Sequence, residues 1–159
     1  IYDDEPVKFF SDLNNFIESI EEPDNDLSEW ATSVGAVLAS QEELIKSDEF
    51  FISLINQKGI EVALDFYKRF KTDNANSMLF FESSMNSLGY KKLADGDMKL
   101  ALGIFQLNVD EYPDSWNAYD SLAEAYLKLG KKKKAIKYYK KSLELNPENE
   151  NGKKVLLTL

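Results

Sequence analysis

The chain has 159 residues and carries 28 acidic against 19 basic side chains, a formal net charge of −9. This length fits one ordinary domain with its own core, and the ten Phe and eight Tyr residues predict a folded chain. The acidic balance argues against nucleic acid as a partner, because neutralising phosphates requires a basic face. The lack of Cys and His excludes disulfides, thiolate nucleophiles and the commonest zinc ligands.

The first residues, Ile1 to Glu5, are neither a Met start nor a signal peptide, and we expect the chain to be cut from a longer precursor. No stretch approaches the roughly 18 apolar residues that indicate a membrane span, so no membrane insertion is expected. A composition without Cys fits a bacterial cytoplasm and a bacterial periplasm equally, which leaves the compartment open.

Residues 1–75 predict a helical N-terminal region. Apolar residues recur at helical spacing from Val7 to Ile20, and a second helical stretch is expected from Leu27 to Ala39. No segment shows sustained alternation with a period of two, so strands are not required.

The end of this region predicts a degenerate, repeat-like helical hairpin over about residues 48–71. Gly59 separates its two helices, and Ser47 is a candidate cap at its start. We expect this hairpin to stack on the helices that follow.

A repeat of 34 residues dominates residues 76–159. Small residues are expected where antiparallel helices cross closely, and large ones fill the space beside them. Glycine ends a first helix in the left-handed conformation, and proline stops a second helix. The first repeat places Gly96, Ala101, Phe105 and Pro113 at the positions that Gly130, Ala135, Tyr139 and Pro147 occupy in the second.

The 34-residue period resembles that of tetratricopeptide (TPR) repeats, and the stretch from Phe105 to Asn149 resembles the repeats on the C-terminal side of bacterial serine hydrolases, both β-lactamase-type and esterase-type. The resemblance implies an all-α fold, a TPR-like superhelix of stacked antiparallel helical hairpins with extra N-terminal helices. Residues 76–159 would then be two repeats and a C-terminal capping helix, in one continuous folded unit with residues 1–75.

Lysines form one basic run in this acidic chain, from Lys131 to Lys134. Residues 1–80 carry 17 acidic and six basic side chains, whereas residues 81–159 carry 11 and 13. We interpret the run as a solvated convex surface; the alternative is a docking patch for an acidic partner.

The sequence predicts no catalysis and no cofactor. It contains no Gly-rich phosphate loop, no Gly-x-Ser-x-Gly elbow and no Ser-x-x-Lys motif. Paired carboxylates such as Asp95 with Asp97, or Asp110 with Glu111, fall at expected turns and helix ends, where acidic residues usually cap helices.

In TPR arrays the concave face lined by the first helices binds partners, and the resemblance carries that role to positions between the packing residues. The alternative is that the N-terminal hairpins or the terminal helix cover this face. The candidate partner-binding residues are Asn86, Tyr90, Leu93, Asn117, Asp120, Glu124, Leu127, Lys128, Asn151 and Lys154.

Two functions follow from these expectations. The first is a non-catalytic protein–protein interaction or scaffold module that binds a peptide or protein segment in the groove. The second is an accessory structural or dimerisation domain of a larger serine hydrolase, whose partner would be an upstream catalytic domain or a second copy.

Overall fold

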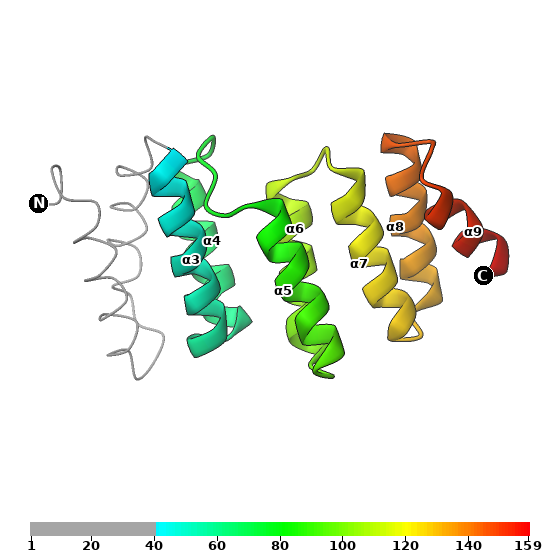
Figure 1. The fold of residues 1–159 in the computed structure, drawn as a ribbon, viewed down its shortest axis with the longest axis horizontal. Coiled ribbons are helices and arrows are strands. Elements are labelled where there is room, and N and C mark those ends of the chain that lie inside the picture. The colour runs from blue at the N-terminus through cyan, green and yellow to red at the C-terminus, as the bar shows by residue number, and fades with distance from the viewer. Residues whose placement is uncertain (1–40) are drawn as a thin grey trace, which may run out of the picture. The chain divides into compact units, whose positions relative to one another are not determined.

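The computed structural model describes residues 41–159, and every regular element in this part of the chain is an α-helix (Figure 1). The all-α prediction is therefore confirmed for these residues. The chain divides into two compact units, Ile1–Phe81 and Glu82–Leu159, which we call unit 1 and unit 2. The helices predicted before residue 40 lie outside the described residues.

Unit 1 contains helices α3 (Gln41–Lys58) and α4 (Ile60–Asp73), which pack against each other. Gly59 alone separates them, with φ 85°, a conformation that only glycine adopts without strain. The predicted break is thus confirmed, whereas the predicted cap at Ser47 is wrong. Ser47 lies buried inside α3, where its hydroxyl donates a hydrogen bond to the Leu79 carbonyl.

Aromatic rings fill the core of unit 1. Phe51 stacks on Phe80 with ring centroids 5.2 Å apart, and Phe50 meets Phe66 edge-on at 5.3 Å. Burying each ring contributes about 2–3 kcal/mol. The Asp48 carboxylate also accepts a hydrogen bond from the backbone N–H of Phe81 at 2.9 Å, which fixes the segment after α4 against α3.

Unit 2 consists of two antiparallel hairpins and a final helix. Helices α5 (Glu82–Ala94) and α6 (Met98–Glu111) form the first hairpin, and α7 (Trp116–Lys128) and α8 (Lys132–Leu145) form the second. Helix α6 packs on α7, and α9 (Glu150–Thr158) packs on α8. These are the stacked hairpins that the 34-residue period predicts.

The turn inside each hairpin is built around a glycine. Gly96 and Gly130 have φ values of 83° and 70°. The N–H groups of the glycine and of the next residue bond back to the last turn of the helix, for example Lys131 N–H to Tyr126 C=O at 2.9 Å. This is the Schellman arrangement, and it confirms the predicted role of both glycines.

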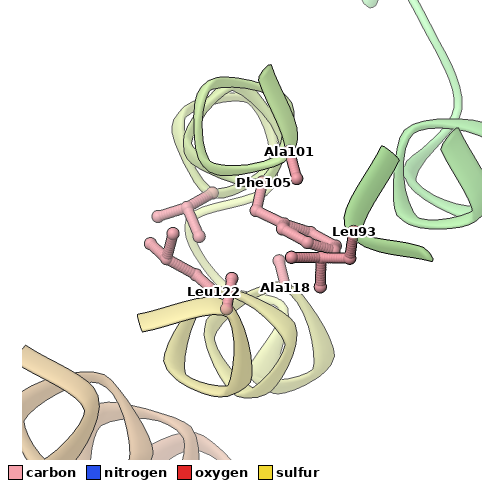
Figure 2. Packing of buried hydrophobic residues seen from close by; sticks show 7 residues of the cluster. Leu93, Ala101, Phe105, Ala118 and Leu122 are labelled. Atoms are coloured by element: carbon pink, nitrogen blue, oxygen red, sulfur yellow. The ribbon is translucent and has the colours of Figure 1, made fainter. Parts of the chain in front are cut away.

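The core of the first hairpin depends on one glycine. Figure 2 shows the Phe105 ring reaching from α6 toward Leu93, with Ala118 and Leu122 of α7 on the facing side. A Cβ atom added to Gly89 would lie 2.6 Å from Cε1 of Phe105, so only glycine lets the ring enter. In the second hairpin Ala123, Ala135 and Tyr139 form the corresponding buried cluster.

Candidate functional site

A row of polar side chains lies along the first helices of the two hairpins. Glu82, Asn86 and Tyr90 are spaced four residues apart on α5 and therefore share one side of that helix. Hydrogen bonds join this row to polar residues of α7. We call the set the polar face; its residues are Glu82, Asn86, Tyr90, Asn117, Glu124 and Lys128.

Glu82 connects the starts of α5 and α7. Its Oε1 accepts a hydrogen bond from the Ser115 hydroxyl at 2.7 Å and another from the Asn117 amide at 3.1 Å. Ser115 also caps α7, because its Oγ accepts from the Ala118 N–H at 3.3 Å. The Glu82 carboxylate of α5 is therefore held by two residues at the start of α7.

Tyr90 makes the second link between these helices. Its hydroxyl donates to Glu124 Oε2 at 2.9 Å and lies 3.3 Å from Ser121 Oγ. Burial raises the pKa of Tyr90 to about 12, and the nearby Glu124 carboxylate adds to the effect. The phenol therefore keeps its proton at neutral pH and acts as a donor. Glu124 also pairs with Lys128 at 3.2 Å.

A buried polar cluster joins the second hairpin to α9. The Asn149 amide donates to Asp120 Oδ1 at 2.6 Å and to Ser142 Oγ at 2.9 Å. Asn149 Oδ1 accepts from the Gly152 N–H at 3.0 Å, which caps α9. Asn151 donates to the other oxygen of Asp120 at 3.2 Å. These four hydrogen bonds therefore connect Asp120, Ser142 and Asn149 into one buried network.

The structure places eight of the ten predicted binding residues in three settings. Asn86, Tyr90, Asn117, Glu124 and Lys128 belong to the polar face, where hydrogen bonds or an ion pair link all but Asn86. Asp120 is buried with Asn151 as its partner, and Lys154 is exposed. Their role in binding stays a prediction.

Two predicted groove positions are packing positions instead. Leu93 is only 6% exposed and belongs to the core of the first hairpin, so the expectation that it faces outward is corrected. The Phe105 ring needs an apolar wall at the end of α5, and Leu93 supplies it. Leu127 is half-buried against the cluster of Ala123, Ala135 and Tyr139.

Sequence reasoning missed Glu82, Ser115 and Asn149, which organise the polar contacts. A signal was present for two of them, because Ser115 and Asn149 lie 34 residues apart and each precedes a helix by one residue. Ser and Asn are preferred helix caps, so the same register that located the glycines could have located these residues.

The predicted lysine surface lies on α8. Lys131, Lys132, Lys133 and Lys134 are all exposed, as a solvated surface requires. The Lys134 ammonium lies 5.0 Å from the centre of the Tyr126 ring, which in turn stacks on Tyr138 at 5.4 Å. Of these four lysines, Lys134 thus rests on an aromatic ring.

Within residues 41–159 we find no group of three or more acidic residues placed to hold a metal ion. No helix in the same part of the chain is long and apolar enough to cross a membrane. Asp97, one of the paired carboxylates, caps α6 by accepting from the Leu100 N–H at 3.1 Å, as expected for an acidic residue at a helix start.

Comparison with known proteins identifies one repeat. The tetratricopeptide repeat model matches residues 117–149, which cover α7 and α8. No curated protein sequence matches the chain. Among solved structures, a crystal structure of MamA is 16% identical with a TM-score of 0.48, over 98% of this chain and 82% of that chain. A MamA RS-1 double mutant is 19% identical with a TM-score of 0.46, over 97% and 83%.

The resemblance to the repeats of serine hydrolases stays a prediction, since these comparisons do not address it. The sequence period, the two glycine turns and the family match agree on the second hairpin. The chain therefore contains a tetratricopeptide repeat, formed by α7 and α8.

Proposed function

We propose that this chain is a non-catalytic interaction module that binds a peptide or protein segment on the polar face of unit 2. The observation that supports this most is the set of hydrogen bonds between neighbouring helices, Glu82 with Asn117 and Tyr90 with Glu124. They hold the side chains of the face in one arrangement before a partner arrives. Such preorganisation lowers the entropic cost of binding.

The chemistry of the face suits a polypeptide. The amide of Asn117 carries both donors and an acceptor, which match the N–H and C=O groups of an extended backbone. Glu124 pairs with Lys128 at 3.2 Å, and Glu82 leaves the face with one net negative charge, so an acidic segment is disfavoured. Tyr90 keeps its proton and cannot act as a base at neutral pH.

The alternative is an accessory or dimerisation domain of a serine hydrolase, which the resemblance of residues 105–149 suggests. Such a domain would expose a contiguous apolar patch when separated from its partner. Unit 2 exposes Leu157 at 87% and Trp116 at 38%, and single exposed apolar residues are ordinary on a soluble surface. Peptide binding is therefore the function that we favour.

Selection of peptides from a random display library on the immobilised chain tests the proposal. A selected peptide should bind the chain in solution, measured by fluorescence anisotropy. Because Asn117 lies on the face, Asn117→Ala should weaken binding at least about tenfold. Lys132→Ala, an exposed change on α8, is the matched control and should leave the affinity unchanged.

Two results would overturn the proposal: failure to select any peptide, or equal affinity for the wild type and Asn117→Ala. Circular dichroism of both variants verifies that the helices are intact. A stable dimer in sedimentation, combined with no selected peptide, would favour the accessory domain instead.

A further inference from the structure

Two side-chain oxygens of the first hairpin are buried without a hydrogen-bond partner. They are Oδ1 of Asn86 on α5 and Oδ1 of Asn108 on α6. Asn108 as a whole is 0% exposed. Buried polar atoms are nearly always hydrogen-bonded in folded proteins, so an unpartnered pair indicates a site for a donor.

The two asparagines are linked through the backbone carbonyl of Glu82. The Asn108 amide donates to the Glu82 carbonyl at 3.2 Å, and that bond fixes which way the amide points. The Glu82 carbonyl lies one helical turn before Asn86, where the backbone N–H of Asn86 faces it. Asn86 is only partly buried, so it lies between the polar face and the interior.

The second hairpin shows how the same positions are satisfied. The residues 34 positions after Asn86 and Asn108 are Asp120 and Ser142. Both accept hydrogen bonds from a single nitrogen, Nδ2 of Asn149, at 2.6 and 2.9 Å. A primary amide with two hydrogens therefore bridges the two positions in the second hairpin.

The first hairpin has Ser115 where the second has Asn149. A serine hydroxyl has one hydrogen, and Ser115 donates it to Glu82 Oε1 at 2.7 Å. Asn117 also donates to Glu82, whereas its counterpart Asn151 donates to Asp120. Both donors are thus directed to Glu82, and the bridging amide nitrogen has no equivalent beside Asn86 and Asn108.

We infer that Asn86 and Asn108 form a recognition site for the primary amide of an Asn or Gln side chain from the bound segment. The partner's amide would take the role that Asn149 plays in the second hairpin, with its two hydrogens directed to the two Oδ1 atoms. It would enter beside Asn86 from the polar face. The inference rests on the proposed function and specifies its partner: a peptide with an essential Asn or Gln.

The variant Ser115→Asn tests the site from the side of the protein. Asn caps helices as well as Ser does, so α7 should persist. The new amide should satisfy the two oxygens, raise the melting midpoint by about 3 °C, and weaken a display-selected peptide at least about tenfold by occupying the site. Ser83→Asn, at an exposed position of α5, is the matched control and should change neither value.

Substitutions in the peptide provide a second test. Replacing its Asn or Gln by Ala should cost as much affinity as Ser115→Asn does, and replacing it by Lys should not restore binding. Asn108→Leu keeps a similar side-chain size but removes the acceptor oxygen, so it should also weaken the peptide. It covers the case in which Ser115→Asn fails to fold.

The outcomes separate this inference from the proposed function. Peptides that lose affinity with Asn117→Ala but not with Ser115→Asn would overturn the amide site alone. A melting midpoint that rises with Ser115→Asn while peptide affinity stays the same would show that the peptide does not use the two oxygens, and would also overturn it. Selected peptides without Asn or Gln would do the same.

Discussion

The cores of the two units follow different packing rules. In unit 1, large rings meet large rings, as in the stacking of Phe51 on Phe80. In unit 2, rings also meet, as Tyr90 meets Phe105 edge-on at 5.2 Å, but the helix crossings set a large ring against a small residue, as where Phe105 fills the space above Gly89. A small residue opposite a large one allows two helices to cross closely, and such pairs recur every 34 residues in unit 2. The ring–ring contacts of unit 1 show no regular spacing in the sequence.

This difference teaches where stability is concentrated. A large buried ring contributes apolar area wherever it lies, so losing one is costly. A small residue at a helix crossing contributes little area itself, but it sets how near two helices come, so enlarging it is what costs. Three substitutions probe the difference, in order of their expected effect.

Phe51→Ala in unit 1 should have the largest effect. The ring is fully buried and contacts both Phe66 and Phe80, with centroids 6.3 and 5.2 Å away. Its removal should lower the free energy of unfolding by about 3–5 kcal/mol. Urea titration followed by circular dichroism measures the loss.

Met78→Ala is the control for this change, since Met78 is exposed and lies in the same unit. It should change stability by less than about 0.5 kcal/mol. A loss below about 1 kcal/mol for Phe51→Ala would show that the aromatic cluster is not the core of unit 1.

Ala135→Leu in unit 2 should cost about 1–3 kcal/mol, because three added carbons have no room between α7 and α8. Ala135 is fully buried beside Ala123 and Tyr139. Lys132→Leu introduces the same side chain at an exposed position of α8 and should be nearly neutral. Equal melting midpoints for the two variants would contradict the small–large rule.

Tyr90→Phe should have the smallest effect at neutral pH, about 1 kcal/mol for the lost hydrogen bond to Glu124. Its signature is the pH dependence. Burial raises the pKa of Tyr90 from 10.0 to about 12, so its contribution is complete below pH 10 and is lost as the pH rises to 12.

Melting curves between pH 9 and 12 measure this loss, which should be smaller in Tyr90→Phe than in the wild type. Tyr139 should keep part of the alkaline loss in the variant, because burial raises its pKa as well. Parallel pH profiles for the two proteins would contradict the buried donor role of Tyr90.

The sequence was sufficient to predict unit 2 because its constraints repeat. Gly96, Gly130, Ala101 and Ala135 each satisfy a local rule, and the 34-residue spacing makes the rules agree. Unit 1 shows no such repeat in its sequence. The predicted cap at Ser47 is wrong because this residue lies inside α3 and donates a hydrogen bond to the carbonyl of Leu79, 32 residues away. A contact over that distance leaves no local signal.

The candidate site was predictable only in part. The resemblance to TPR repeats assigns Asn86 and Tyr90 to the face of the first helix, and both lie on one side of α5. Leu93 was misassigned, because its burial depends on where the Phe105 ring lies. The hydrogen-bond donors around Asn86 and Glu82 depend on whether the next helix starts with a serine, as at Ser115, or an asparagine. Their directions can be seen only in the three-dimensional structure.

Asn149 has a consequence for how unit 2 unfolds. Helix α9 has nine residues, too few for an isolated helix to be stable in water. Fraying it would remove both amide donors, Asn149 and Asn151, from the buried carboxylate of Asp120 on α7. Losing these hydrogen bonds to a charged group costs free energy, so we expect the contacts with the second hairpin to keep this short helix folded. The last helix is thus coupled to the repeat it covers by two amides, Asn149 and Asn151, and by apolar contacts of Val155 and Leu156 with the cluster of Ala123, Ala135 and Tyr139.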